Sequence, residues 1–253
     1  MDLRERVDGS TQRHPWELAR MNAIHAIIES VIGDQGEIRM LDVGCGDGFV
    51  CRDLSRRADV QVIYGVDVHL TDREVDALRK ADEKVIYSND YMGLPEKRCN
   101  LVLLLDVLEH VREDGGFLDE IADRYLSNDG YLVITVPAFQ SLYSHHDTFL
   151  AHFRRYDRKA LIRLIHGANL SCIRSGYLFL SLLPVRIAEV AYERMTGGEG
   201  GRTHGVGQWA AGRTLTCVLN AIMQYDNRFS LLLNSFGVRI PGLTVWAVCG
   251  KRA

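Results

Sequence analysis

The sequence has no Cys-x-x-Cys pair: its six cysteines stand apart, at positions 45, 51, 99, 172, 217 and 249. Cysteines scattered in this way are typical of buried thiols in a reducing compartment, rather than of a disulfide framework or a zinc site. The first residues alternate in charge without an apolar run, so we expect no signal peptide. The uncharged stretches 175–185 and 214–225 are shorter than the about 20 residues that cross a bilayer. We therefore expect a soluble, cytoplasmic protein.

The sequence also has no excess of basic charge. Its 30 lysines and arginines are balanced by 33 aspartates and glutamates, for a formal net charge of -3. A general nucleic-acid binder is usually far more basic, so nucleic acid is disfavoured as a partner. Hydrophobic residues make up 47% and charged residues 25% of the 253 positions. This composition excludes a disordered or fibrous protein and fits one large α/β domain, or two small ones.

The chain alternates between two hydrophobic periods. A helical pattern, with apolar residues every three or four positions, follows Pro15. Short, continuous apolar runs then predict strands that are buried on both faces. These runs are 38–43, 60–66, 84–87, 101–105 and 131–136, followed later by 171–180 and 243–249. Because helical patterns separate the first five runs, the sequence predicts a doubly wound α/β fold with a mostly parallel sheet.

A glycine-rich segment follows the first predicted strand and precedes a helical pattern. It reads Asp42-Val43-Gly44-Cys45-Gly46-Asp47-Gly48. Glycines at such a turn let bare backbone approach a ligand at the start of a helix. A dinucleotide-binding oxidoreductase would need the pattern G-x-G-x-x-G, but Phe49 stands where its third glycine belongs. The turn alone is weak evidence for a ligand site, because the same glycines are also found in turns that only reverse the chain.

The segments around this turn resemble the motifs of class I S-adenosylmethionine-dependent methyltransferases. Residues 41–48 resemble the first motif, and Asp67, 21 residues after Gly46, ends the second strand as the ribose-binding acid does there. Residues 89–91 resemble the adenine-contacting motif, while 100–111 and 129–137 resemble the fourth and fifth. Within the family, the acid at the position of Asp67 accepts both ribose hydroxyls, and a carboxylate suits such a diol.

The resemblance implies a fold, a cofactor and a set of contacts. The fold is a seven-stranded doubly wound sheet whose last strand is antiparallel. The cofactor is S-adenosylmethionine, and the product is S-adenosylhomocysteine. We expect a single methyltransferase domain over 1–253, with an N-terminal helical segment (1–36), a cofactor-binding core (37–180), a helical insertion or lid (181–242) and a last strand (243–253). The expected cofactor-binding residues are Asp42, Gly44, Cys45, Gly46, Asp67, Val68, Asn89, Asp90, Tyr91 and Asp106.

A second group of polar residues follows the fifth predicted strand. It contains His145-His146-Asp147 and His152-Phe153-Arg154-Arg155-Tyr156, and it resembles a segment of one loosely defined methyltransferase subgroup. The functional interpretation makes His146 and His152 catalytic, while Arg154, Arg155 and Tyr156 bind an acceptor that carries an anion. The alternative is a solvated helix start whose arginines pair with surface acids.

Two further features leave alternatives open. Asp106, Glu109 and His110, with a later histidine, offer ligands to a divalent metal, but a Glu-His pair at this place is widespread in the superfamily without metal, so we expect none. In the insertion, apolar segments lie among arginines 186, 194, 228 and 239. These segments either complete the core and cover the acceptor pocket, or make a peripheral membrane contact.

The sequence as a whole favours methyl transfer to oxygen on a small-molecule or lipid-linked acceptor. The alternatives are an N- or C-methyltransferase, where a base matters less, and a non-catalytic partner protein that only binds the cofactor. The acceptor itself and the oligomeric state have no signal in the sequence.

Overall fold

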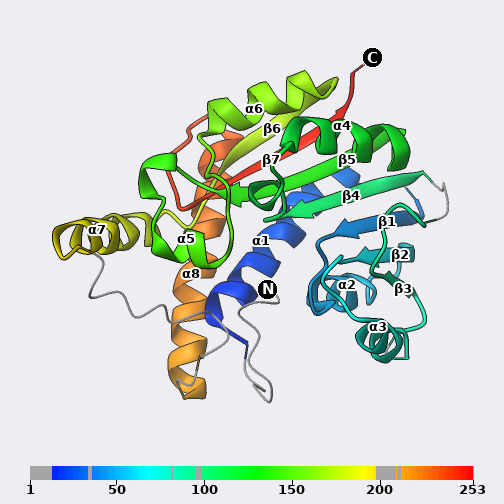
Figure 1. Ribbon diagram of the computed structural model, residues 1–253, viewed down its shortest axis with the longest axis horizontal. Helices are drawn as coiled ribbons and strands as arrows, with labels where there is room; N and C mark the ends of the chain where they lie inside the picture. Colours follow the sequence, from blue (N-terminus) through cyan, green and yellow to red (C-terminus); the bar gives the residue numbers. More distant parts are fainter. Residues whose placement is uncertain are drawn as a thin grey trace. The chain divides into compact units, whose positions relative to one another are not determined.

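A computed structural model describes residues 13–33, 36–80, 82–94, 98–197, 209 and 212–252. These residues form one seven-stranded sheet in the order β3-β2-β1-β4-β5-β7-β6, with helices between the strands (Figure 1). The strands are β1 (Ile38–Val43), β2 (Val60–Val66), β3 (Val85–Ser88), β4 (Cys99–Leu105), β5 (Leu126–Pro137), β6 (Leu170–Leu178) and β7 (Thr244–Lys251). The predicted doubly wound sheet is confirmed.

The helices also follow the sequence pattern. They are α1 (Pro15–Ile32), α2 (Phe49–Leu54), α3 (Asp72–Arg79), α4 (Asp114–Tyr125), α5 (His145–Phe149), α6 (Arg158–Gly167), α7 (Leu182–Met195) and α8 (Arg213–Ser235), with short 3₁₀ helices η2 (Leu108–His110) and η3 (Gln140–Leu142). Thr71 caps α3: its side chain accepts from the Glu74 amide, and the Glu74 carboxylate accepts from the Thr71 amide. The glycine-rich part of the insertion, 198–208, lies outside the described residues.

The first five strands are parallel, and β1 is the point where the strand order reverses. β1 pairs with β2 on one side and with β4 on the other, while β3 and β5 extend the sheet outward. Five of the six side chains of β1 are buried, as expected for a strand covered on both faces. Open α/β sheets bind ligands beyond the carboxyl ends of the strands at such a reversal. The turn after β1 is therefore the expected ligand site.

The last strand runs against its neighbours. The amide of Ala138, just past the end of β5, donates to the carbonyl of Leu243, just before the start of β7, at 2.9 Å. At the other end of β7, the amide of Arg252 donates to the carbonyl of Asn169, just before the start of β6, at 3.2 Å. The start of β7 therefore lies beside the end of β5, and the end of β7 lies beside the start of β6. This makes β7 antiparallel to both neighbours and confirms the prediction of an antiparallel last strand.

The chain divides into two compact units. The sheet unit comprises the described residues of 31–135, 159–174 and 247–252, and the helical unit those of 1–30, 136–158 and 175–246. Strands β5, β6 and β7 each pass from one unit into the other. The prediction of a single domain over 1–253 stays a prediction.

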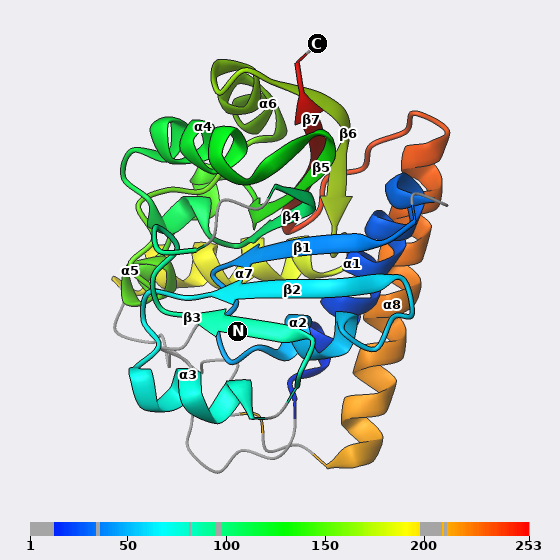
Figure 2. The ribbon, with the colours of Figure 1, turned by 90° about the vertical axis from the view of Figure 1, so that its right-hand side faces the viewer.

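The sheet unit carries β1 to β4 with their helices. Figure 2 shows β1, β2 and β3 side by side, with α3 next to β3. Every residue of β4 except Asn100 is buried, and α4 buries Leu118, Ile121 and Tyr125. Burying such side chains contributes about 1.5–3 kcal/mol each, so the core fixes the strand ends that bear the candidate site.

The helical unit contains α1, α5, α7 and α8. The two figures agree that α1 and α8 lie side by side (Figures 1 and 2), and the Asn227 side-chain amide donates to the Ala19 carbonyl at 3.4 Å. On α7, Val190 is buried while Val185 and Ile187 are half exposed. The expected core of the insertion is therefore only partly formed by α7. In the described part of the chain, no helix combines the length and apolarity that crossing a bilayer requires.

Candidate functional site

The turn after β1 is held in place by the neighbouring strand. The amides of Gly44 and Cys45 both donate to the carbonyl of Val66, at 2.7 and 3.0 Å. Gly44 has a φ of +77°, and a Cβ there would come within 2.6 Å of Val107 Cγ2. Because a side chain would be both strained and obstructed, only glycine fits at this position. Gly44 is exposed, so its bare backbone faces solvent beyond the strand end.

Asp67, directly after β2, is joined to this turn. Its Oδ2 accepts from the Gly46 amide at 2.9 Å, and its Oδ1 accepts from the His69 amide at 2.9 Å. The side chain keeps 12% of its surface exposed. Oδ2 retains a second acceptor position for a hydroxyl donor. The second position of Oδ1 faces Nδ1 of the exposed His69 side chain at 3.3 Å, so a hydroxyl there would replace the imidazole. This geometry fits the vicinal diol of a ribose, which the sequence predicted as its ligand.

Asp42 lies deeper, inside the end of β1. Its side chain is buried, and Oδ2 is 3.2 Å from the Cys51 sulfur on α2. The hydrogen bond with Cys45 and burial raise the pKa of Cys51 well above its ordinary value, so the thiol is a neutral donor. Asp42 therefore links β1 to α2 through a hydrogen bond, and this link helps to fix the turn that connects the two elements. Its predicted direct contact with a cofactor stays a prediction.

The segment after β3 contains the predicted adenine contacts. The Asn89 side-chain amide donates to Asp72 Oδ1 at 2.9 Å and to the Leu70 carbonyl at 3.3 Å, which links the segment to the start of α3. Asp90 is exposed, and its Oδ1 accepts from the Met92 amide at 2.8 Å. The Tyr91 carbonyl accepts from the Tyr125 hydroxyl. The segment is thus a fixed turn with an exposed carboxylate.

The end of β4 holds Asp106 in an unusual backbone conformation. Asp106 has a φ of 57°, which is rare for a residue with a side chain. Its amide donates to the Thr135 carbonyl at 2.9 Å, and its Oδ1 accepts from the Thr135 hydroxyl at 3.0 Å. Such conformations cost about 1–3 kcal/mol and cluster at functional sites. Thr135 on β5, which sequence analysis did not select, is the residue that holds Asp106 there.

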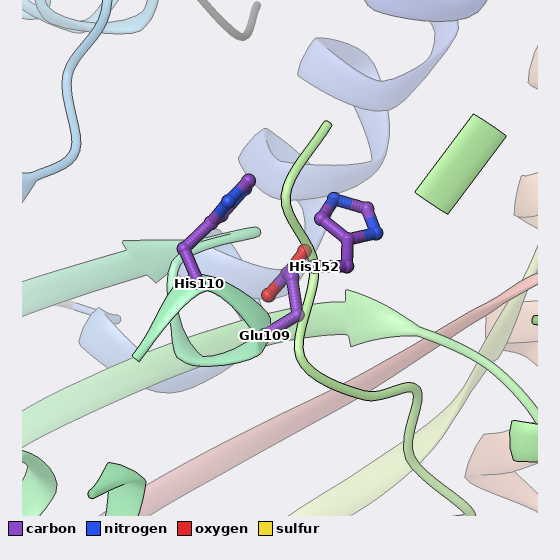
Figure 3. A group of neighbouring side chains, drawn as sticks. All are labelled: Glu109, His110 and His152. Carbon is purple, nitrogen blue, oxygen red and sulfur yellow. The ribbon is translucent and has the colours of Figure 1, made fainter. Parts of the chain in front are cut away.

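The candidate metal ligands of the sheet unit come directly after Asp106 in the chain. Figure 3 shows Glu109 and His110 on η2, the turn after β4, with their side chains drawn as sticks. Glu109 is fully buried and His110 is partly buried. Glu109, His110 and His152 of the helical unit each offer one atom that ligates metals. The predicted absence of a metal stays a prediction.

The helical unit has a network centred on Asp147. Ser144 and Asp147 form a capping box at the start of α5, in which the Asp147 carboxylate accepts from the Ser144 amide at 3.0 Å. Asp147 is fully buried, and its other partners are Arg155 Nε at 2.7 Å, His152 Nδ1 at 2.9 Å and an Arg186 Nη at 3.4 Å. One carboxylate therefore organises two arginines and a histidine.

The hydrogen bonds of this network fix the charge and the tautomer of its members. Burial alone would raise the pKa of the Asp147 carboxyl, but the hydrogen bond from His152 and the guanidinium of Arg155 hold it well below its ordinary value. An ionised Asp147 can only accept a hydrogen bond, so Nδ1 of His152 is the protonated nitrogen that donates to it and Nε2 carries the lone pair of the ring. His152, drawn in Figure 3, has a side chain that is 8% exposed. The arrangement is that of a histidine oriented by a carboxylate.

The other predicted acceptor residues differ in exposure. Arg155 is buried, and besides Asp147 it donates to the Ala138 carbonyl at 3.3 Å. Tyr156 is buried and continues the sheet by pairing with Ala138. These contacts hold the segment in place, and the predicted binding of the acceptor by Arg155 and Tyr156 stays a prediction. Arg154 is only partly buried, and it remains the candidate for an anion on the acceptor.

His146, the second predicted catalytic residue, lies on α5. Burial, followed by the charge of Arg186, lowers its pKa, so it is neutral near pH 7. A pocket of about 380 Å³ lies next to it in the helical unit, between α5 and α7, and its lining includes Ser144, His145, Glu193 and Arg194. Neither His146 nor His152 lines this pocket.

Sequence analysis missed two members of the network. Asp147 was noticed but not selected as a site residue, although Ser144-Phe149 carries the capping-box spacing that predicts its burial at a helix start. Arg186 was considered only as one of the arginines that flank the apolar segments, but its guanidinium donates to Ser144 Oγ and Asp147. No local pattern relates residues 39 positions apart.

Comparison with known proteins identifies relatives of part of the chain. The family model described as "Methyltransferase domain" matches residues 18–175. The ubiquinone biosynthesis O-methyltransferase of Rhodopseudomonas palustris strain TIE-1 is 35% identical over 91 residues, which are 34% of each chain. That of Bradyrhizobium sp. strain ORS 278 is 35% identical over 104 residues, 39% of each chain. The match spans little more than a third of the length of these curated relatives.

Solved structures share the fold. Phosphoethanolamine N-methyltransferase 2 of Haemonchus contortus, solved with phosphomonomethylethanolamine and S-adenosylhomocysteine, aligns with a TM-score of 0.57 at 15% identity, over 92% of this chain and 53% of that one. The [4+2]-cyclase SpnF aligns with a TM-score of 0.54 at 18% identity, over 93% and 82%. Because one of these neighbours is a cyclase, the shared fold does not by itself establish an activity.

Proposed function

This chain belongs to the methyltransferase domain family, and on that basis we propose that it transfers the methyl group of S-adenosylmethionine to an oxygen of a small-molecule or lipid-linked acceptor. The observation that carries the proposal is the pair formed by His152 and the buried Asp147. Transfer to a hydroxyl needs a base to remove its proton, whereas a base matters less for a neutral amine, whose nitrogen already carries a lone pair. The curated relatives that match part of the chain are named O-methyltransferases, which also favours oxygen.

The cofactor half of the proposal is supported by the sheet unit. When bound, S-adenosylmethionine supplies an electrophilic methyl group on a sulfonium. The turn at Gly44 leaves backbone uncovered at the reversal of the sheet. Asp67 Oδ2 retains an acceptor position for one ribose hydroxyl, and the other hydroxyl would replace the exposed His69 side chain at Oδ1. Asp90, exposed after β3, stands where the resemblance places the adenine contact. These residues fit the cofactor.

The chemical half is supported by the helical unit. As the hydroxyl oxygen forms its bond to the methyl carbon and the carbon–sulfur bond breaks, His152 Nε2 takes the hydroxyl proton. The resulting imidazolium is stabilised by the ionised Asp147 that accepts from its Nδ1. Arg155, held against Asp147 at 2.7 Å, keeps that carboxylate ionised and in position. We assign Arg154, which is only partly buried, to binding an anionic group of the acceptor.

Calorimetry with S-adenosylhomocysteine tests the cofactor site through Asp67. We expect Asp67→Ala to weaken the dissociation constant at least about tenfold, because charge-assisted hydrogen bonds contribute about 1.5–3 kcal/mol each. Asp67→Asn, which keeps one acceptor oxygen, should fall between Asp67→Ala and the wild type. Asp76→Ala removes an exposed carboxylate of α3 and serves as the matched control. An unchanged constant in Asp67→Ala would remove the ribose assignment.

A chelator tests whether the reaction needs a metal. We expect full methyl transfer after exhaustive dialysis against EDTA, because His152 with Asp147 supplies the base without a metal. The rate is measured before and after dialysis, and again after Mg²⁺ or Zn²⁺ is restored. Activity that is lost on chelation and restored by one ion would instead assign Glu109, His110 or His152 a role as ligand.

A further inference from the structure

Helix α8 is amphipathic in the opposite sense to an ordinary surface helix. Its buried residues are Thr216, Met223, Asn227 and Ser230, three of which are polar. Its exposed face carries large apolar side chains instead. A surface helix normally turns its apolar stripe toward the core and its polar face toward water. The orientation of α8 therefore needs a separate explanation.

Hydrogen bonds within the helical unit fix this orientation. Asn227 Oδ1 accepts from the Phe179 amide at 2.8 Å, and Ser230 Oγ donates to the Tyr177 carbonyl at 2.6 Å. One turn later, the Asn234 side-chain amide donates to the Ser175 carbonyl at 2.8 Å. Rotating the helix to bury its apolar face would leave these buried polar groups unpaired, at about 1–3 kcal/mol each. The apolar face is thus directed outward by the fold itself.

The exposed apolar side chains follow a regular spacing. Their steps along the chain alternate between three and four residues, which is the heptad spacing of a helix that packs on another helix. We call these residues the α8 seam: Leu215, Val218, Ile222, Tyr225, Phe229, Leu232 and, directly after the helix, Phe236. Each is half or more exposed. On α7 the same spacing covers only the shorter set Val185, Ala188, Tyr192 and Met195, and Ile187 lies off it.

The area of the seam matches what a dimer requires. Seven large side chains that are each at least half exposed present on the order of 700 Å², and each partner in a standard-size interface contributes about 800 Å². A patch of this size is rare on a monomer unless it binds something. Since a second copy of the chain offers a helix with the same spacing, the seam is complementary to itself about a two-fold axis.

We propose that two copies of this chain associate through the α8 seam, helix against helix. The proposal goes beyond the enzymatic function and does not depend on it. A lipid surface is the competing occupant, but the charges fit it poorly. A helix that lies on anionic lipid carries lysines and arginines that reach the headgroups. Helix α8 carries only two arginines, Arg213 and Arg228, both exposed, and no lysine along its 23 residues. Outside α8, Arg186, Arg194 and Arg239 donate to other groups of the protein.

Sedimentation velocity tests the dimer. We expect the wild-type chain to sediment at twice its mass of 28.5 kDa at about 10 µM. Ile222→Glu places a charge from each copy in the middle of the seam, and it should weaken the dimer dissociation constant at least about a hundredfold. Cys217→Glu introduces the same charge at an exposed position of α8 outside the seam, so it should sediment as the wild type does.

Two further measurements make each outcome decisive. Phe236→Glu lies beyond the end of α8 and should also weaken the dimer, so it replaces Ile222→Glu if that variant does not fold. Anionic and neutral vesicles are pelleted with each protein at low and high salt. A wild-type chain that stays monomeric up to about 100 µM, or Ile222→Glu and Cys217→Glu with equal dissociation constants, would overturn the proposal. A monomer that pellets with anionic vesicles would assign the seam to lipid.

Discussion

Replacing His152 by alanine is expected to lower the turnover number of methyl transfer by about 10²- to 10⁴-fold, the usual contribution of a general base. The reason is that Asp147 accepts the hydrogen bond from Nδ1–H and leaves Nε2 as the basic atom, and alanine has no atom that could take the proton there. Affinity for S-adenosylhomocysteine should not change, because the predicted cofactor contacts belong to the sheet unit.

Steady-state kinetics with the identified acceptor, together with calorimetry, separates these two effects. His166→Ala removes an exposed histidine at the end of α6 and is the matched control. Raising the pH should restore part of the activity of His152→Ala if the acceptor is a hydroxyl that ionises in the range tested, since the acceptor then needs no base. Wild-type turnover in His152→Ala would show that His152 is structural and that the base lies elsewhere.

Replacing Asp147 by alanine is expected to reduce the free energy of unfolding by about 3–5 kcal/mol, the cost of breaking a buried ion pair by removing one partner. The substitution leaves the buried guanidinium of Arg155 without its carboxylate and also removes the capping contact of α5. Urea denaturation at pH 7 measures the loss. Asp129→Ala, which removes an exposed carboxylate of β5, should stay within about 0.5 kcal/mol of the wild type.

The same carboxylate predicts a dependence of stability on pH. The pKa of Asp147 is lower in the folded protein than its ordinary value of 3.8, so its contribution is fully present above that value and is lost as the pH falls below it. The difference in unfolding free energy between the wild type and Asp147→Asn should therefore shrink as the pH is lowered from 5 toward 2. A difference that is constant over that range would mean that Asp147 is not ionised in the folded protein.

The sheet could be predicted because its strands are continuous apolar runs. The ends of β1 and β2 were predicted to the residue, since both strands are buried and bounded by Gly or Asp. The start of β5 was predicted at 131 but lies at Leu126, because the polar residues at 128 and 129 are exposed within the strand and interrupt the apolar run. Hydrophobic periodicity therefore locates the buried part of a strand, but it does not locate a strand end whose residues are exposed to solvent.

The candidate site was predictable where its residues are local to a motif. Gly44, Gly46 and Asp67 lie at strand ends in a known order, and the structure joins Asp67 to the turn through the Gly46 amide. The role of Arg186 was not predictable, because the sequence around it is apolar and its partner Asp147 lies on another helix. The orientation of α8 could not be predicted for a related reason. Hydrogen bonds from its polar side chains to backbone groups distant in sequence determine which face is buried. Hydrophobic periodicity contains no information about such bonds.

Transfer of a labelled methyl group tests the central claim most directly. The wild-type chain is incubated with methyl-labelled S-adenosylmethionine and a metabolite or lipid extract, beside His152→Ala and Asp67→Ala. We predict that wild type labels an acceptor at oxygen, that Asp67→Ala does so only at higher cofactor concentration, and that His152→Ala leaves the acceptor almost unlabelled. A wild-type chain that binds the cofactor in calorimetry but labels nothing in any extract, or that labels only nitrogen or carbon, would contradict the proposed oxygen transfer.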